Sequence, residues 1–276
     1  MNDLPDRDFS TLADQLQTRF LGKPLHFFDT IDSTNTYAAR LAREGASEGT
    51  VVIADSQSGG KGRLGRSWVS PPGVNLYLSA ILRPPVPTAT VPQVNLLAAV
   101  AVADTIVQAC GLTPAIKWPN DVLVGGRKVC GILAEMQTEA GTLRAVVLGI
   151  GVNLNAPLAA FPEELREKAS SLFLAGGRLV NRPAFTVALL THLEKLYVLW
   201  LEGGFSALRP AWEHHAAWMI GMQITVAAPD GTVAGTVLGL DSDGALLLRE
   251  SDSGTPRRLL AGDVTVVGGY TYGVRS

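Results

Sequence analysis

Apolar residues recur along the chain with two different periods, and each period predicts a different kind of element. A helical period predicts four helices, over residues 33–45, 92–110, 183–201 and 206–218. Ser33 stands at the start of the first helix as a capping residue, and Gly203-Gly204 separates the last two. The second helix is long, rich in alanine and almost wholly apolar, so we expect it to be buried.

Apolar runs that lack the helical period predict strands. These runs cover residues 49–54, 74–82, 115–118, 129–136 and 143–149. The short connections Gly125-Gly126 and Glu139-Ala140-Gly141 predict hairpins. Because a hairpin joins antiparallel neighbours, we expect an antiparallel sheet with helices over one of its faces.

After Met219 the pattern changes to short strands separated by turn residues. The turn signals are Pro229-Asp230-Gly231, Ser242-Asp243-Gly244 and Ser253-Gly254. This spacing predicts a small β-barrel. We therefore expect two domains, a large one over residues 1–219 and a small one over residues 220–276.

Composition and charge exclude several classes of protein. The chain has 276 residues, of which 47% are hydrophobic and 17% charged, as in a globular protein with a large core. A formal net charge of -2 gives no long-range attraction to nucleic acid or to an anionic membrane. Cys110 and Cys130 are isolated from each other and from any histidine, so we expect two buried, reduced thiols.

The chain shows no pattern that predicts membrane insertion or export. The most apolar stretch, residues 96–103, is far shorter than the roughly 20 residues of a membrane span. Residues 1–21 begin with acidic residues and lack the basic start and apolar block of a signal peptide. We therefore expect a cytoplasmic protein.

The strongest local signal is a glycine-rich basic segment at residues 60–68, named here the cationic loop. It holds Lys61, Arg63 and Arg66 among Gly60, Gly62 and Gly65, and such a loop suits phosphate. A solvated basic turn is the alternative. The glycines match a dinucleotide-binding fingerprint nominally, but Ser70-Pro71-Pro72-Gly73 ends any helix that would follow. A Walker loop is also excluded, because Gly62 follows Lys61 where Ser or Thr is needed.

Two further polar segments follow apolar strands. Residues 117–121 read Lys-Trp-Pro-Asn-Asp, and a hairpin would bring Lys117, Asp121 and Lys128 into one neighbourhood. Residues 149–153 combine small residues with Asn153, which leaves room for a flat ligand and offers an amide to a purine edge. The alternatives are an ordinary charged hairpin end and a bend into a loop.

In order and spacing, these segments together resemble the biotin–protein ligase family over roughly residues 26–270. The resemblance implies an α+β fold: a catalytic domain like that of class II aminoacyl-tRNA synthetases, with a mixed, largely antiparallel sheet, and a C-terminal SH3-like barrel. It implies activation of biotin with ATP and Mg²⁺, the metal held mainly by ATP phosphates, and transfer to a lysine of the biotin carrier domain of a carboxylase.

The resemblance also implies roles for individual residues. Biotin would contact Ser33, Thr34, Asn35, Gln57, Gly60, Lys61, Gly62, Arg63, Lys128, Gly131, Ile132 and Leu133. ATP or the adenylate would contact Arg63, Arg66, Trp68, Lys117, Asn120, Lys128 and Asn153. Lys128, Arg63 and Lys61 would act in catalysis, and Asp121 is our candidate for orienting or deprotonating the acceptor amine.

Two positions depart from the family pattern. Lys61 stands where many members have Arg, and Leu64 where some have a further Arg, which puts retention of the adenylate in doubt. About 25 residues precede the catalytic domain, too few for a DNA-binding winged helix, so we expect no repressor function. The chain would be a monomer or a weak homodimer. The alternatives are a lipoate–protein ligase and a non-catalytic binding module.

Overall fold

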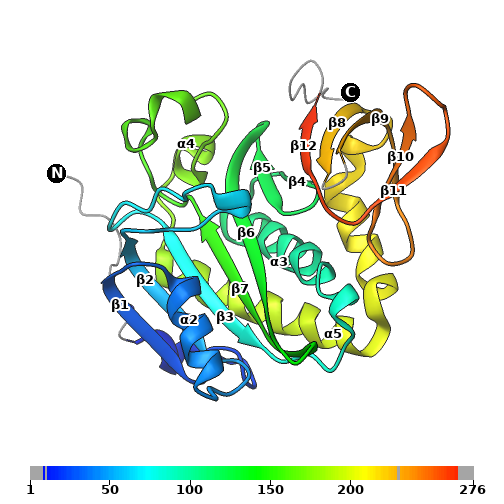
Figure 1. The fold of residues 1–276 in the computed structure, drawn as a ribbon. Helices are drawn as coiled ribbons and strands as arrows, with labels where there is room; N and C mark the ends of the chain where they lie inside the picture. The colour runs from blue at the N-terminus through cyan, green and yellow to red at the C-terminus, as the bar shows by residue number, and fades with distance from the viewer. Residues whose placement is uncertain (1–8, 10, 229–230, 267–276) are drawn as a thin grey trace.

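A computed structural model describes residue 9, residues 11–228 and residues 231–266. The predicted turn at Pro229-Asp230 and both ends of the chain lie outside the described residues. The described chain forms two sheets, one of seven strands and one of five. Figure 1 shows the larger sheet with its helices and the smaller sheet beside them.

The seven-stranded sheet is mixed and largely antiparallel, as the resemblance implied. Its strand order is β1-β2-β3-β7-β6-β5-β4, and only β1 and β2 pair in parallel. The strands are β1 (Leu25–Ile31), β2 (Val51–Gln57), β3 (Leu76–Leu82), β4 (Pro114–Lys117), β5 (Asp121–Val124), β6 (Arg127–Glu139) and β7 (Thr142–Val152). Both predicted hairpins are present, at the β5–β6 and β6–β7 turns.

Helices cover both faces of this sheet, whereas the sequence predicted one. Helix α2 (Thr34–Arg43) packs on one face, and α3 (Gln93–Cys110) with α5 (Arg182–Ala216) packs on the other (Figure 1). The second face is covered because α2 is the crossover that joins the parallel strands β1 and β2, and such a connection must pass over the sheet.

The remaining helices are short. They are α1 (Leu12–Gln15), α4 (Leu172–Gly176) and the 3₁₀ turns η1 (Arg63–Gly65), η2 (Thr88–Thr90), η3 (Leu158–Ala160), η4 (Glu163–Leu165) and η5 (Ala217–Met219). The long α5 is interrupted at Gly204, whose φ of 63° and ψ of -163° are not helical. The two helices predicted on either side of this position are therefore the two segments of α5.

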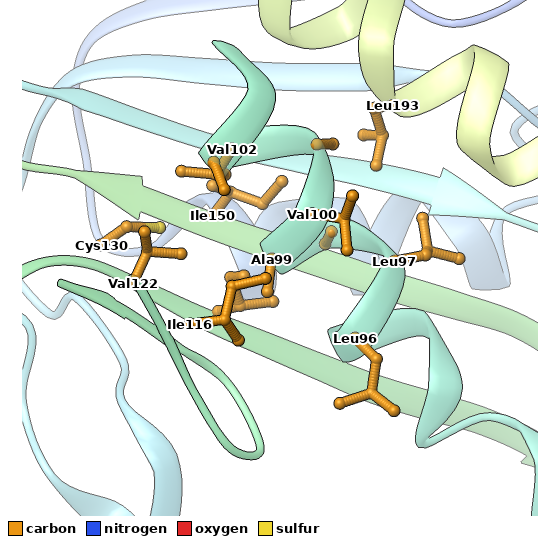
Figure 2. Close-up of a cluster of buried hydrophobic side chains, with 14 of the residues drawn as sticks. Leu96, Leu97, Ala99, Val100, Val102, Ile116, Val122, Cys130, Ile150 and Leu193 are labelled. Atoms are coloured by element: carbon orange, nitrogen blue, oxygen red, sulfur yellow. The ribbon is translucent and has the colours of Figure 1, made fainter. Parts of the chain in front are cut away.

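Helix α3 is the centre of the core. Leu97, Val100 and Val102 are fully buried between the strands and α5 (Figure 2). By length and composition alone, the segments Thr88–Cys110 and Arg182–Met219 are apolar enough to cross a membrane. In the first, 72% of the apolar window is buried within the protein, as expected of a core helix. Cys110 and Cys130 are both free thiols; Cys130 is buried as predicted, whereas Cys110, in the last turn of α3, is only partly buried.

The five-stranded sheet is antiparallel and fits the SH3-like domain that the resemblance implied. Its order is β11-β10-β9-β8-β12, formed by β8 (Gln223–Ala228), β9 (Gly231–Leu240), β10 (Leu246–Glu250), β11 (Pro256–Leu259) and β12 (Asp263–Val266). Its β9–β10 turn docks on the larger sheet, where Trp118 Nε1 donates to Gly244 O at 3.4 Å. Gly244 has a φ of +87° and lies against Leu96, so a side chain there would clash.

One buried carboxylate ties the segment before β1 to helix α5. Glu194 accepts backbone N–H bonds from Arg19 (2.6 Å), Phe20 (2.9 Å) and Leu21 (2.9 Å). Burial acts to raise the pKa of Glu194, but the three N–H donors outweigh it and hold this pKa below its ordinary 4.5. A depressed pKa contributes stability above pH 4.5 that is lost as the pH falls through the folded-state value.

We therefore expect Glu194→Gln to lower the free energy of unfolding by about 1–3 kcal/mol at pH 7, since the amide replaces one acceptor oxygen by an NH2 group and removes the negative charge that the N–H donors stabilise. Chemical denaturation measures this loss. The difference in free energy of unfolding between the wild type and Glu194→Gln should become smaller as the pH is lowered below 4.5. Glu202→Gln, at an exposed position on the same helix, is the matched control. If this difference did not change with pH, the ionised carboxylate of Glu194 would not be the source of the stability.

Candidate functional site

An open cleft of about 460 Å³ lies where the start of α2, the end of β2, the cationic loop and strands β6 and β7 meet. Most of the residues singled out from the sequence line it together. These are Ser33, Thr34, Asn35, Gln57, Lys61, Gly62, Arg63, Trp68, Asn120, Lys128, Gly131, Ile132 and Leu133. Segments from four separate parts of the chain thus form one pocket.

Hydrogen-bonding side chains form one wall of this pocket. Gln57 Oε1 accepts from Thr34 N at 2.9 Å and from Thr34 Oγ1 at 3.1 Å. Asn35 Nδ2 donates to Glu135 Oε2 at 2.7 Å. Ser79 Oγ lies 2.8 Å from Thr34 Oγ1 and 2.6 Å from Asn35 Oδ1, so its single proton goes to one of these acceptors. The wall is held rigidly by its own bonds.

Another part of the pocket surface is flat because glycines form it. A Cβ at Gly151 would lie 2.6 Å from Trp68 Cε2, and one at Gly131 would lie 2.8 Å from Trp68 Cζ3. A Cβ at Gly149 would collide with the amide of Asn35. These positions therefore accept only glycine if the indole and the amide are to stay in place.

The indole of Trp68 packs on Gly131 and Gly151 and places an N–H group there. Its indole N–H is buried and has no hydrogen-bond partner among the described residues. Buried donors are almost always paired, so this N–H is suited to a ligand acceptor. The ammonium group of Lys128 lies 5.5 Å from the centre of the same ring.

A lysine and a carboxylate face each other at one end of the pocket. Lys128 Nζ lies 2.6 Å from Asp121 Oδ1, and both side chains are largely buried. Lys117 lies beside them, because it is the register partner of Asp121 in the β4–β5 hairpin. The neighbourhood predicted for these three residues is present.

The cationic loop leaves β2 and returns beside it through a narrow neck. Trp68 N donates to Gly60 O at 2.8 Å, and Gly62 N donates to Arg66 O at 2.7 Å. At the tip, Leu64 has a φ of 56° and its side chain is 73% exposed. A leucine in this left-handed conformation costs about 1 kcal/mol or more, so the tip is a strained segment.

The arginines of the loop contact both domains. Arg63 donates to Asn120 Oδ1 at 2.8 Å and to Gly262 O, in the β11–β12 connection, at 3.1 Å. Arg66 pairs with Asp263 at 3.0 Å on the outer side of the loop. Burial lowers the pKa of Arg63 while Asp121 and Asp263 oppose this, and an arginine so placed stays charged at neutral pH.

Several residues named from the sequence lie outside the pocket lining. Gly60 is buried in the neck of the loop, Arg66 faces the outer groove, and Lys117 and Asp121 lie behind Lys128. Asn153 is 4% exposed; its Nδ2 donates to Ser170 O at 3.0 Å, and its Oδ1 accepts from Asn75 Nδ2 at 3.4 Å. The adenine contact assigned to Asn153 stays a prediction.

Sequence reasoning missed Tyr77 and Leu78 in the pocket lining and the supporting residues Ser70, Ser79 and Glu135. Ser79 was visible as the one polar residue of an otherwise apolar or aromatic strand, β3. Among the described residues, no group of three or more His, Cys, Asp and Glu side chains gathers to hold a metal ion.

Known proteins share both parts of this chain. Residues 27–153 match the biotin/lipoate A/B protein ligase family, and residues 219–267 match the biotin protein ligase C terminal domain. The chain is 41% identical over 237 residues to the bifunctional ligase/repressor BirA of Bacillus subtilis, covering 86% of this chain and 73% of that protein. It is 38% identical over 221 residues to the biotin–[acetyl-CoA-carboxylase] ligase of Paracoccus denitrificans, covering 79% and 91%.

The fold is also that of a solved structure. The biotin protein ligase from Aquifex aeolicus in complex with biotin and ATP matches it with a TM-score of 0.76 at 27% identity, over 88% of this chain and 98% of that chain. Fold and pocket thus define a protein ligase of the biotin and lipoate class. Within that class, the matched C-terminal domain and the relatives at 41% and 38% identity show that the chain belongs to the biotin protein ligases. The resemblance seen in the sequence is confirmed.

Proposed function

We propose that this protein joins biotin to a lysine of a biotin carrier domain in two steps. The biotin carboxylate attacks the α-phosphorus of ATP, which forms biotinyl-5′-AMP and releases pyrophosphate. The amine of the acceptor lysine then attacks the biotinyl carbonyl, which forms an amide and releases AMP. The observation that carries the proposal is a single pocket lined both by hydrogen-bonding side chains and by the cations Lys61, Arg63 and Lys128.

The polar wall suits the ureido ring of biotin. That ring carries two N–H donors and one carbonyl acceptor, and Ser33, Thr34, Asn35 and Gln57 supply hydroxyl and amide groups of both kinds. The dithiolane ring of lipoate has no such groups and could not use the hydrogen-bonding capacity that these side chains have left, at a cost in affinity. Ile132 and Leu133 would pack against the apolar chain of biotin.

The cations make the first step possible. Biotin carboxylate and ATP repel each other until positive groups neutralise them, and Lys61, Arg63 and Lys128 lie around the same cleft. Fixed charges that face the developing charge in a closed site are typically worth several kcal/mol. Mg²⁺ would accompany ATP through the phosphate oxygens, and no step depends here on a metal ligand from the protein.

The cationic loop would cover the adenylate and keep water from the mixed anhydride. Its glycines, its exposed tip and its narrow neck are features of a segment that closes over a ligand.

The adenine ring would lie beside Trp68, whose unpaired N–H would find an acceptor on the nucleotide. Neither ATP nor the acceptor domain is a membrane component, and we place the reaction in the cytoplasm.

We expect Gly151→Ala to raise the KM for ATP roughly tenfold, because an added methyl group in packed space costs about 1–3 kcal/mol and must displace Trp68. Steady-state kinetics with varied ATP measures this. The control is Gly176→Ala at the end of α4, outside the pocket lining, where a Cβ would meet Leu112 at an ordinary contact distance of 3.4 Å. An unchanged KM for ATP would show that Trp68 does not contact the nucleotide.

The function is tested with purified protein, biotin, ATP, Mg²⁺ and a biotin carrier domain. Pyrophosphate release without the carrier domain reports the first step, and a mass increase of one biotinyl group on the carrier reports the second. Lipoate in place of biotin should give neither product. Pyrophosphate release with lipoate but not biotin would reassign the substrate, and no release with either would overturn the proposal.

A further inference from the structure

A buried serine connects the polar wall of the pocket to the neck of the cationic loop. Gln57, which accepts two hydrogen bonds from Thr34, donates through Nε2 to Ser70 Oγ at 2.9 Å. Ser70 Oγ in turn donates to Trp68 O at 3.0 Å. The hydroxyl of Ser70 thus accepts a hydrogen bond from Gln57, which lines the pocket, and donates one to Trp68 at the end of the cationic loop.

The surroundings of Ser70 leave its hydroxyl little freedom. Ser70 is 8% exposed, and its backbone carbonyl accepts from Gln57 N at 3.3 Å, so the two residues are joined twice. A Cβ at Gly60 would lie 2.8 Å from Ser70 Oγ and 3.1 Å from Gln57 Nε2, and would collide with the carbonyl of Trp68. The first residue of the loop is therefore packed directly against this connection.

The bond to Ser70 fixes which way the amide of Gln57 points. The Gln57 side chain has one acceptor oxygen and two N–H donors. Thr34 occupies the oxygen and Ser70 occupies one N–H, which leaves the other N–H for a ligand carbonyl in the cleft that Gln57 lines. Without Ser70, the amide loses the partner that holds this donor in place.

We propose that Ser70 is a positioning residue: it orients Gln57 toward the carbonyl of the biotin ureido ring and, through the same hydroxyl, ties that orientation to the neck of the cationic loop. The inference rests on the proposed function, because the orientation of Gln57 matters only if biotin binds there. Ser70 itself lies outside the lining of the cleft, so it acts through Gln57 rather than on the ligand.

The first test compares biotin affinity by calorimetric titration without ATP. Loss of an oriented hydrogen bond reduces binding roughly three- to tenfold, so Ser70→Ala should raise the Kd for biotin by that factor. The rate of adenylate formation at saturating biotin should stay within about threefold of the wild type. Thr105→Val removes another fully buried hydroxyl, on α3, and should leave the Kd unchanged.

A double-mutant cycle separates positioning from a general loss of stability. If Ser70 acts through Gln57, adding Ser70→Ala to Gln57→Ala should change the Kd for biotin less than about twofold. If the two substitutions instead raised the Kd by independent factors that multiply in the double mutant, the inference would be overturned. Ser70→Cys keeps the shape of the side chain with a weaker hydrogen-bonding group, so its Kd for biotin should lie between those of the wild type and Ser70→Ala. This variant replaces Ser70→Ala in the test if the alanine variant does not fold.

The bond to the loop gives a readout that needs no ligand. Lys61, Arg63 and Arg66 are trypsin sites in the loop, and Ser70→Ala should speed cleavage there relative to the wild type and to Thr105→Val. Cleavage and Kd both equal to the wild type would refute the role of Ser70. If the wild type itself bound no biotin, the proposed function would fail instead, and the two failures are thus distinct.

Discussion

Replacing Lys128 by methionine is expected to slow formation of biotinyl-5′-AMP by roughly 100- to 1,000-fold, the usual effect of removing one preorganised charge from a reaction centre. Lys128 lines the cleft and its Nζ lies 2.6 Å from Asp121 Oδ1, so its charge is held in place before any substrate arrives. Methionine keeps the length of the side chain and removes only the ammonium group. Pyrophosphate release in a single turnover measures the change.

The control for this variant is Lys195→Met, which removes a charge at an exposed position on α5 and should leave the rate within about twofold. Lys128→Met is also expected to lower the melting temperature, because it leaves the carboxylate of Asp121 without its charged partner, so the two rates are compared at a temperature where both proteins are folded. A Lys128→Met protein with a rate within about fivefold of the wild type would remove Lys128 from the reaction.

The second step is expected to depend on Asp121. An amine with a pKa of roughly 10.4 is neutral in only about one molecule in 2,500 at pH 7, so the acceptor lysine needs a group that takes or disfavours its proton. The carboxylate of Asp121 lies beside Lys128 at the end of the cleft. Asp121→Asn should therefore slow biotin transfer about 100-fold, within the usual range for acid–base catalysis.

Adenylate formation should fall less than about tenfold in Asp121→Asn, because Lys128, Arg63 and Lys61 are retained. The two steps are separated by mixing preformed biotinyl-5′-AMP with enzyme and carrier domain and following the mass of the carrier. Asp29→Asn, on the exposed edge strand β1, is the control. Equal slowing of both steps would show that Asp121 only holds Lys128.

The fold could be predicted wherever burial leaves a clear pattern in the sequence. Strands β2, β3, β6 and β7 are apolar runs because they lie inside the sheet, and α3 is almost wholly apolar because most of its length is enclosed. Strands β1 and β5 were missed. Strand β1 is an edge strand with no fully buried residue, and its residues mix polar and apolar types without a clean alternation. Strand β5 has only four residues and begins inside the polar segment at residues 117–121.

The sequence predicted many of the residues that line the candidate site but not the hydrogen bonds that join them. The loop glycines, Lys128 and the Gly149–Gly151 pair stand out because backbone approach and charge restrict which residues fit there. Ser70 and Ser79 did not stand out, because a serine in a loop or a strand carries no pattern until its partners are known. Their partners, Gln57 and Thr34, come from distant parts of the sequence.

Arg63 contacts Gly262 in the β11–β12 connection and Arg66 contacts Asp263 at the start of β12, and these contacts couple the cationic loop energetically to the small sheet. A ligand that holds the cationic loop in this position also favours the docked small sheet, since both contacts exist only when loop and sheet are in place together. The coupling is reciprocal, so a firmly docked small sheet favours retention of the ligand by the same factor. Amide hydrogen exchange along β12 should then slow when the distant end of the pocket is filled, although the ligand touches no residue of that strand.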